Sequence, residues 1–98
     1  MVVSKKNPII RAHILVTGRV QGVGFRYNTL ELAQSLGISG WVRNTENSAV
    51  EIIAQGQKDA LEKFVEKIKK GFFSGNIKNC SVEFEELQEK IFGFEIRH

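Results

Sequence analysis

Cysteine, proline and long apolar runs are scarce in this 98-residue sequence. Its single cysteine, Cys80, has no partner for an intrachain disulfide, which fits a reducing compartment. A single proline and nine glycines exclude a proline-rich linker or a low-complexity chain. No stretch approaches the roughly 20 apolar residues of a membrane span, and residues 1–11 lack the apolar core of a signal peptide. We therefore expect a cytoplasmic protein without membrane contact.

The residues that most hydrolases rely on are also few. The only aspartate, Asp59, cannot form the carboxylate cluster that an aspartyl-phosphate enzyme builds around a metal. A cysteine phosphatase needs an arginine six positions after its cysteine, where this chain has Glu86. His13 and His98 lack ligand partners at metal-binding spacing, so we predict neither a metal nor a cofactor.

The composition is that of one small globular domain with a mild positive charge. Apolar residues make up 42% of the chain, enough for a core without metal or disulfide, and the formal net charge is +3. This charge suits an anionic ligand but does not require one. We interpret His13 as a satisfied strand residue. The C-terminal glutamates are interpreted as a solvated face: Glu83, Glu85, Glu86 and Glu89.

Hydrophobic periodicity divides the chain into alternating strand and helix segments. Strands are predicted over 13–18, 38–44, 49–54 and 80–85, helices over 25–36 and 57–70, and Phe92, Phe94 and Ile96 allow a further short strand. The order βαββαβ predicts an α+β fold, the ferredoxin-like α/β sandwich, with two helices on one face of a mostly antiparallel sheet. We expect a loose leader over 1–11 and a single domain over 12–98.

A glycine-rich segment from Gly18 to Arg26 joins the first predicted strand to the first predicted helix. Backbone N–H groups at a helix start are unpaired, and the helix dipole favours an anion there. Glycines allow close approach of a ligand to the backbone, and Arg26 can add a bidentate, permanently charged clamp. These features predict a cradle for one phosphate. Its backbone would come from Gln21, Gly22, Val23, Gly24 and Phe25.

Neither of two widespread phosphate motifs explains this segment. A P-loop would need a lysine after its second glycine, and the dinucleotide fingerprint would need glycine where the chain has Tyr27. On the residues alone, a tight strand-to-helix turn with a solvated arginine explains the segment equally well.

A second segment, Gly40 to Thr45, ends the strand that follows the first helix. In the predicted topology the end of this strand and the glycine-rich loop can converge, so that Asn44 would face the loop. An isolated asparagine at such a place more often caps a turn.

The two segments, read as Gly-Arg-Val-Gln-Gly-Val-Gly-Phe-Arg (18–26) and Gly-Trp-Val-Arg-Asn (40–44), closely resemble the signature segments of the acylphosphatase family. The similarity extends over about residues 12–97, with Asn47-Ser48 standing where the family often has Asp-Gly. The resemblance implies a ferredoxin-like enzyme that hydrolyses small acyl phosphates without a metal. It implies that Arg26 binds the phosphate and that Asn44 positions the water.

The chemistry of an acyl phosphate explains why so few residues could suffice. Its leaving group is a carboxylate, which departs without protonation, so no general acid is required. An amide such as Asn44 is no base at neutral pH, but it can accept a hydrogen bond from water and aim the oxygen at phosphorus. Arg26 and the loop amides would stabilise the charge on the phosphoryl oxygens.

A non-catalytic ferredoxin-like module that binds a phosphate or a partner is the alternative function. Nucleic-acid binding is not expected, because Trp41 is the only large ring on the predicted central strands and the basic residues are scattered. We expect a monomer whose partner is a small acyl phosphate, with phosphate and sulfate as inhibitors.

Overall fold

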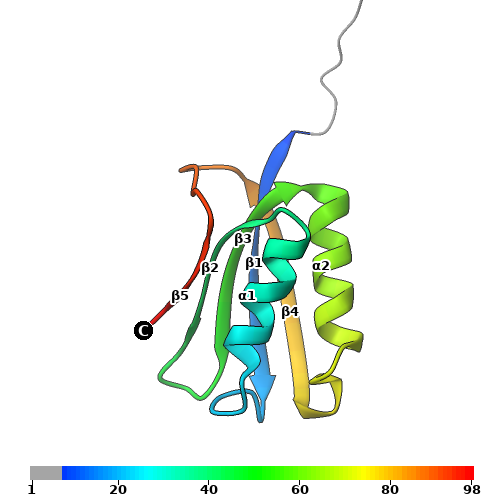
Figure 1. Cartoon of the computed structure of the whole chain (residues 1–98), viewed down its shortest axis with the longest axis vertical. Helices are drawn as coiled ribbons and strands as arrows, with labels where there is room; N and C mark the ends of the chain where they lie inside the picture. The colour runs from blue at the N-terminus through cyan, green and yellow to red at the C-terminus, as the bar shows by residue number, and fades with distance from the viewer. Residues whose placement is uncertain (1–7) are drawn as a thin grey trace, which may run out of the picture.

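The computed structural model describes residues 8–98, which form a five-stranded sheet with two helices across one face (Figure 1). The elements are β1 Ile9–Gly18, α1 Phe25–Ser35, β2 Ser39–Asn44, β3 Val50–Gln57, α2 Lys58–Lys70, the 3-10 turn η1 Ser74–Asn76, β4 Ile77–Glu86 and β5 Phe94–Arg97. This order confirms the predicted βαββαβ arrangement with a short terminal strand, the ferredoxin-like α/β sandwich.

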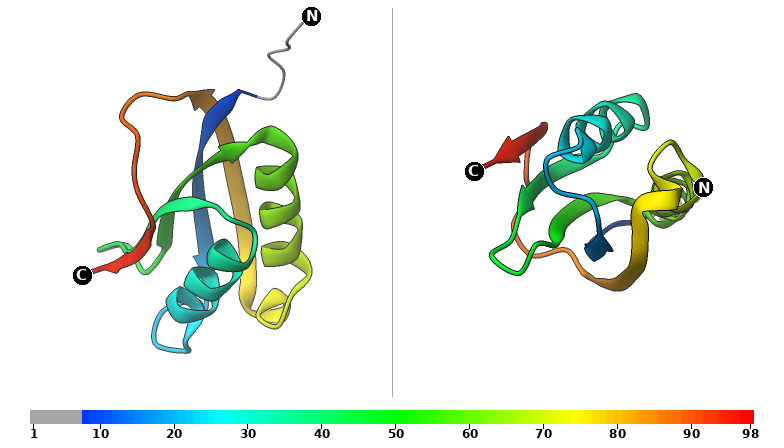
Figure 2. Two further views of the ribbon diagram at one scale, coloured as in Figure 1. Left: turned by 45° about the horizontal axis from the view of Figure 1, so that its top comes forward. Right: turned by 90° about the horizontal axis from the view of Figure 1, so that it is seen from below.

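The sheet has the order β4-β1-β3-β2-β5. Each pair among the first four strands is antiparallel, and only β5 runs parallel to its neighbour β2. Both helices lie on the same side of this sheet, and the other face is left open (Figure 2). Because β5 runs parallel to β2, the two strands finish at the same end of the sheet, close to the predicted site.

The core lies between the sheet and the helices. Alternate residues of the central strands point toward the helices and are completely buried, because successive side chains of a strand face opposite ways. On β1 they are Ala12, Ile14 and Val16. Helix α2 contributes Leu61, Phe64 and Ile68, whose spacing of three and four places them on one side of the helix.

The predicted leader over 1–11 is wrong for residues 9–11. Ile9 already belongs to β1 and pairs with Gln57 of β3, while Ile10 pairs with Glu86 of β4. The strand extends beyond its alternating pattern because both neighbouring strands are longer than predicted and supply ladder partners there. The remainder of the leader, 1–7, lies outside the described residues.

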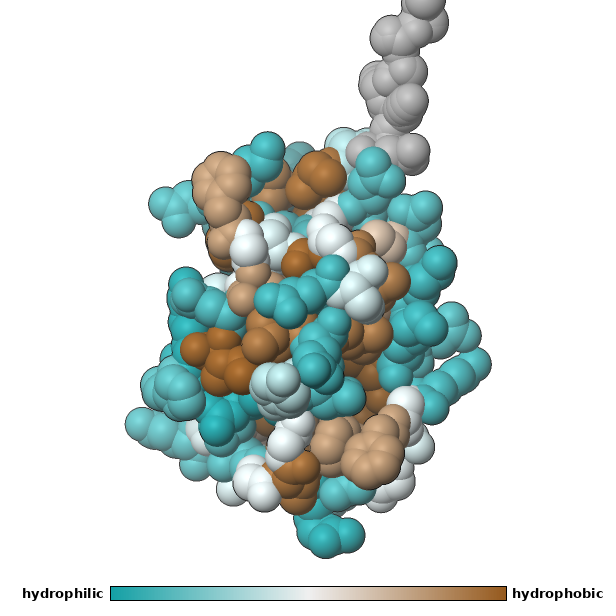
Figure 3. All heavy atoms as spheres, in the orientation of Figure 1, coloured by the Kyte–Doolittle hydropathy of each residue, from teal (hydrophilic) through white to brown (hydrophobic). Residues whose placement is uncertain are grey.

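The helical face is mixed in character. Figure 3 shows hydrophilic residues along both edges of this face and hydrophobic residues exposed between them. Neither helix in the described part of the chain is long and apolar enough to cross a membrane.

The turn between β2 and β3 contains the one described non-glycine residue with a positive φ, Ser48 at 68°. A side chain in this left-handed region costs roughly 1–2 kcal/mol, and glycine removes that cost. Glycine also gains entropy in the unfolded chain, which offsets part of this benefit. We therefore expect Ser48→Gly to raise the free energy of unfolding by roughly 0.5–1 kcal/mol. Urea denaturation measures the change.

Ser48→Ala is the matched control, because alanine keeps the Cβ atom and with it the backbone cost. It should be no more stable than the wild type. Equal stability of the glycine and alanine variants would contradict the assignment of strain to this residue.

Candidate active site

The loop between β1 and α1 presents backbone donors at a helix start. Gly22 and Gly24 have φ values of 76° and 92°, and Gly24 is the N-cap of α1. The first helical hydrogen bond in the described structure runs from Asn28 N–H to the Gly24 carbonyl at 3.0 Å. The amides of residues 21–26 have no such backbone partner within residues 8–98, and the first turn of α1 carries no acidic residue. Unpaired amides at the start of a helix are the features that favour binding of an anion.

The side chain of Gln21 holds the loop against the β2–β3 turn. Its Nε2 donates to the carbonyl oxygen of Thr45 at 2.9 Å and to that of Ala49 at 2.8 Å. Both acceptors flank the turn that follows Asn44. The predicted contribution of Gln21 was its backbone, and the structure adds this bridging role of its side chain.

The first residues of the loop are fixed to Asn76, the last residue of η1. Arg19 N–H donates to the Asn76 carbonyl at 2.9 Å, and Asn76 Nδ2 donates back to the Arg19 carbonyl at 3.0 Å. A Cβ atom on Gly18 would lie 2.2 Å from the Asn76 oxygen, so only glycine allows this close approach. The loop is therefore held at two points, Arg19 and Gln21, both near its N-terminal end.

Arg26 lies at the rim of a small cavity beside the loop. The cavity measures about 180 Å³ and is lined by residues of the loop, of α1 and of the C-terminal strand, among them Gly22, Gly24, Arg26 and His98. Its neighbour Phe25 is buried against Phe73, with ring centroids 5.6 Å apart, which anchors the first turn of α1. The half-buried Arg26 is thus fixed at its backbone and adjustable at its charged end.

His98 contacts Arg26 directly. Arg26 Nη1 donates to His98 Nδ1 at 3.3 Å, although 72 positions separate the two residues in the chain. The contact arises because β5 lies parallel to β2 and brings the end of the chain to the loop. Sequence reasoning missed His98 as a site residue, and no local pattern could have indicated it.

Asn44 is the last residue of β2, beside the turn that the loop contacts. Its Oδ1 atom is buried and has no hydrogen-bond partner among the described residues. Its side chain does not line the cavity beside Arg26. Asn44 is nevertheless near the loop, because it directly precedes Thr45, whose carbonyl accepts from Gln21. The last parallel pair between β2 and β5 is Arg43–Arg97, and Asn44 and His98 are the residues that follow it on the two strands.

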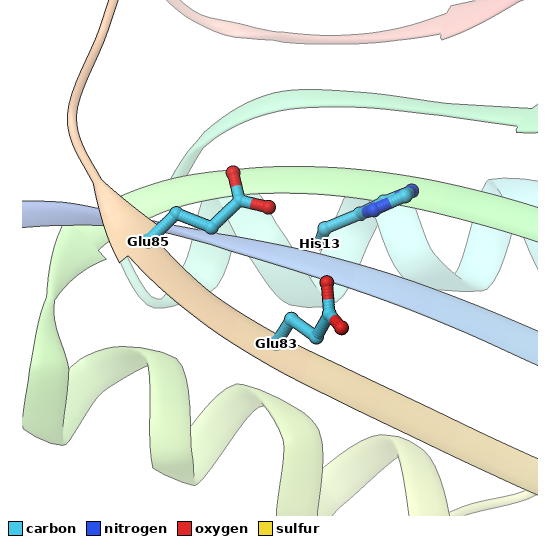
Figure 4. Close-up of side chains that lie close together, drawn as sticks. All are labelled: His13, Glu83 and Glu85. Atoms are coloured by element: carbon cyan, nitrogen blue, oxygen red, sulfur yellow. The ribbon is translucent and has the colours of Figure 1, made fainter.

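The candidate metal ligands lie elsewhere. Within residues 8–98, one group of three ligand-type side chains is close enough to hold an ion: His13, Glu83 and Glu85 (Figure 4). The prediction that His13 lacks ligand partners is therefore wrong, because antiparallel pairing sets Glu83 directly opposite His13. These side chains lie on the open face of the sheet, and none of them lines the cavity beside Arg26.

Known proteins resemble the chain over nearly its whole length. The family model described as Acylphosphatase matches residues 12–96. An acylphosphatase of Nostoc sp. (strain PCC 7120) is 44% identical over 92 residues, which cover 94% of this chain and 90% of the relative. The crystal structure of acylphosphatase from Bacillus subtilis superposes with a TM-score of 0.85 at 38% identity, covering 91% of this chain and 99% of that one. Full-length HypF, in its phosphate- and nucleotide-bound form, matches with a TM-score of 0.86 at 30% identity, covering 98% of this chain and 13% of HypF.

The bridge made by Gln21 can be tested by its stability effect. Gln21→Met keeps the length of the side chain but removes both hydrogen bonds to the turn. We expect the free energy of unfolding to fall by roughly 1–3 kcal/mol, since the Thr45 carbonyl loses its donor in a half-buried place. Amide exchange at Thr45, whose N–H donates to the Ala49 carbonyl beside the bridge, should become faster.

Gln34→Met, on the exposed side of α1, is the control and should unfold like the wild type. If Gln21→Met unfolded at the same urea concentration and its Thr45 amide exchanged at the same rate, the bridge would not hold the loop.

Proposed function

Because the chain belongs to the acylphosphatase family, we propose that Arg26 holds the phosphate of its substrate while Asn44 positions the attacking water. The reaction of the family is the hydrolysis of an acyl phosphate to a carboxylate and inorganic phosphate. The assignment of these two residues is supported by the resemblance of residues 18–26 and 40–44 to the signature segments of the family and by the chemistry of the reaction.

The unpaired Oδ1 of Asn44 is the observation that carries the proposal. A hydrogen bond to a buried acceptor is worth roughly 1–3 kcal/mol, and no protein group within residues 8–98 supplies one to this atom. A water molecule that donates to Oδ1 satisfies this atom and has its own lone pair turned away from it. Such a water is oriented for attack and needs no base in the protein.

Arg26 and the loop amides supply the charge that the phosphate requires. The guanidinium offers a planar fork that can donate two parallel hydrogen bonds to phosphate oxygens. Its present partner, His98, offers a single contact at 3.3 Å, so a dianionic phosphate with several acceptor oxygens competes with it readily. The amides of residues 21–26 and the positive end of α1 add donors that are already in place, which is how phosphoryl transfer is usually catalysed.

The proposed reaction balances without a metal or an acid. Water forms a new P–O bond as the bond between phosphorus and the acyl oxygen breaks, and the bonding electrons leave with the carboxylate. The water's proton passes to a phosphoryl oxygen of the substrate itself. Neither step asks a protein side chain to gain or lose a proton.

The proposal extends to the inhibitors of the protein, its location, its assembly and the bounds of its domain. We propose that inorganic phosphate and sulfate inhibit by occupying the loop, and that the protein acts as a cytoplasmic monomer. The domain that carries the chemistry would extend over 12–98, preceded by the first residues of β1. A non-catalytic binding module is not favoured, because the named relative is an acylphosphatase matched over 90% of its length.

Hydrolysis of benzoyl phosphate by purified protein tests the reaction and its need for metal. We expect turnover to continue in EDTA and to gain nothing from added magnesium, because the proposed mechanism makes no use of a metal. The measurement is the loss of the benzoyl phosphate absorbance. A rate that disappears with the chelator and returns with a divalent ion would overturn the mechanism.

Two variants separate the two assigned roles. Asn44→Ala should lower kcat by about 10²–10³-fold and leave the phosphate Kd near that of the wild type, because it acts on the water. Arg26→Ala should weaken phosphate binding at least about tenfold as well as nearly abolishing turnover, because it removes charged hydrogen bonds of roughly 1.5–3 kcal/mol each. Steady-state kinetics and phosphate titration by NMR give the two quantities.

The controls are an arginine and an asparagine that lie near the site but have exposed side chains, Arg19 and Asn28. Their alanine variants should keep kcat within about threefold. Near-normal kcat in Asn44→Ala, or normal phosphate binding in Arg26→Ala, would refute the assigned role of that residue.

A further inference from the structure

The open face of the sheet carries a group of side chains that hydrolysis does not use. His13 projects from β1 and Glu83 and Glu85 from the adjacent β4, with one potential ligand atom of each within 4.8 Å of the others. His13 and Glu83 are direct cross-strand partners, and Glu85 lies two residues further along β4 on the same face. Figure 4 shows the two carboxylates gathered beside the imidazole of His13.

Glu51 of β3 holds the imidazole of His13 in one orientation, on the side of β1 away from β4. The ring's Nε2 lies 2.7 Å from Oε2 of Glu51 on β3. Oε1 of the same carboxylate accepts from Arg43 Nε and Nη2, each at 2.8 Å. A carboxylate that already accepts two hydrogen bonds from a guanidinium serves as an acceptor toward His13 as well. His13 therefore donates its Nε2 proton to Glu51.

This hydrogen bond determines what the other ring nitrogen can do. A neutral imidazole with its proton on Nε2 has a free lone pair on Nδ1. Metal-binding histidines almost always donate their second nitrogen to a carboxylate or carbonyl in this way, which fixes the tautomer and strengthens the ligand. Glu51 and Arg43 thus provide His13 with the outer support that a metal-binding histidine normally has.

We propose that His13, Glu83 and Glu85 form a binding site for a divalent transition-metal ion, with zinc as the best match. One imidazole nitrogen and two carboxylate oxygens are a zinc ligand set, with a water completing the tetrahedron. Calcium and magnesium prefer sites built from oxygen alone. Ligands about 2.0–2.2 Å from zinc lie about 3.3 Å apart, so binding requires the exposed Glu83 to move inward.

Neighbouring basic side chains leave carboxylate oxygens of the site available for a cation. Within residues 8–98, Glu83 has no ion-pair partner, and Glu85 pairs through one oxygen with Arg11 at 3.0 Å. The second oxygen of Glu85 is left for the metal. Arg43 is already engaged by Glu51 on the far side of His13.

The site is separate from the hydrolytic one. It cross-links β1 and β4 on the face opposite the helices, whereas Arg26 and Asn44 lie at the end of the sheet where β1 and β2 finish. Zinc should therefore act on stability and not on turnover. At a hundred times its Kd, it should raise Tm by roughly 10 °C or more.

Calorimetric titration of the full chain with zinc chloride, after removal of metal by EDTA, tests the proposal. We expect one ion per chain. His13→Gln and the double variant Glu83→Gln/Glu85→Gln should abolish binding or weaken it at least about 100-fold, while His98→Gln, the matched control, should bind like the wild type. Glu51→Gln should weaken zinc about 10–100-fold by loosening the support of His13.

Two further measurements keep the test decisive. Long-range ¹H–¹⁵N NMR should show the wild-type His13 ring protonated at Nε2, with Nδ1 shifting when zinc is added. Benzoyl phosphate turnover should be the same with and without zinc and in Glu83→Gln, so a failure of the hydrolytic proposal would appear separately. Absence of wild-type binding at 100 µM zinc, binding by His13→Gln as tight as wild type, or an Nδ1-protonated ring would overturn the metal site.

Discussion

Two hydrogen bonds from Gln21 hold a strand-to-helix loop against the turn that follows β2, and the site depends on this bridge. The loop has to leave its own amides unpaired if they are to receive a phosphate. A loop with unpaired amides has few backbone bonds to stabilise it, so its position must come from side chains and from its two ends. Gln21 holds the loop to the β2–β3 turn, and the Arg19–Asn76 pair holds it to η1.

The same bridge connects the two parts of the proposed mechanism. It joins the loop to Thr45, and Asn44 immediately precedes that residue. The bridge thereby connects the proposed phosphate-binding loop to the residue proposed to position the water. Catalysis by positioning requires such a fixed relation between the two. The unpaired Oδ1 of Asn44 and the free loop amides both fall at the place where the reaction is proposed.

The sequence predicted the fold and the proposed site residues because their signals are local. Alternation and helical periodicity come from neighbouring residues, and the two signature segments carry Arg26 and Asn44 within a few positions of their glycines. Features that depend on pairing between distant strands could not be predicted in this way. The start of β1 at Ile9, the Arg26–His98 contact and the approach of Glu83 to His13 all require knowledge of register.

The central claim is that water attacks phosphorus, aimed by an amide and not activated by a base. Hydrolysis of benzoyl phosphate in H₂¹⁸O tests it most directly, because the two products are easily separated and weighed by mass spectrometry. The account predicts one ¹⁸O atom in the inorganic phosphate and none in the benzoate from a single enzymatic turnover. Label in the benzoate would mean attack at the carbonyl carbon, and the assigned geometry of Arg26 and Asn44 would then be wrong.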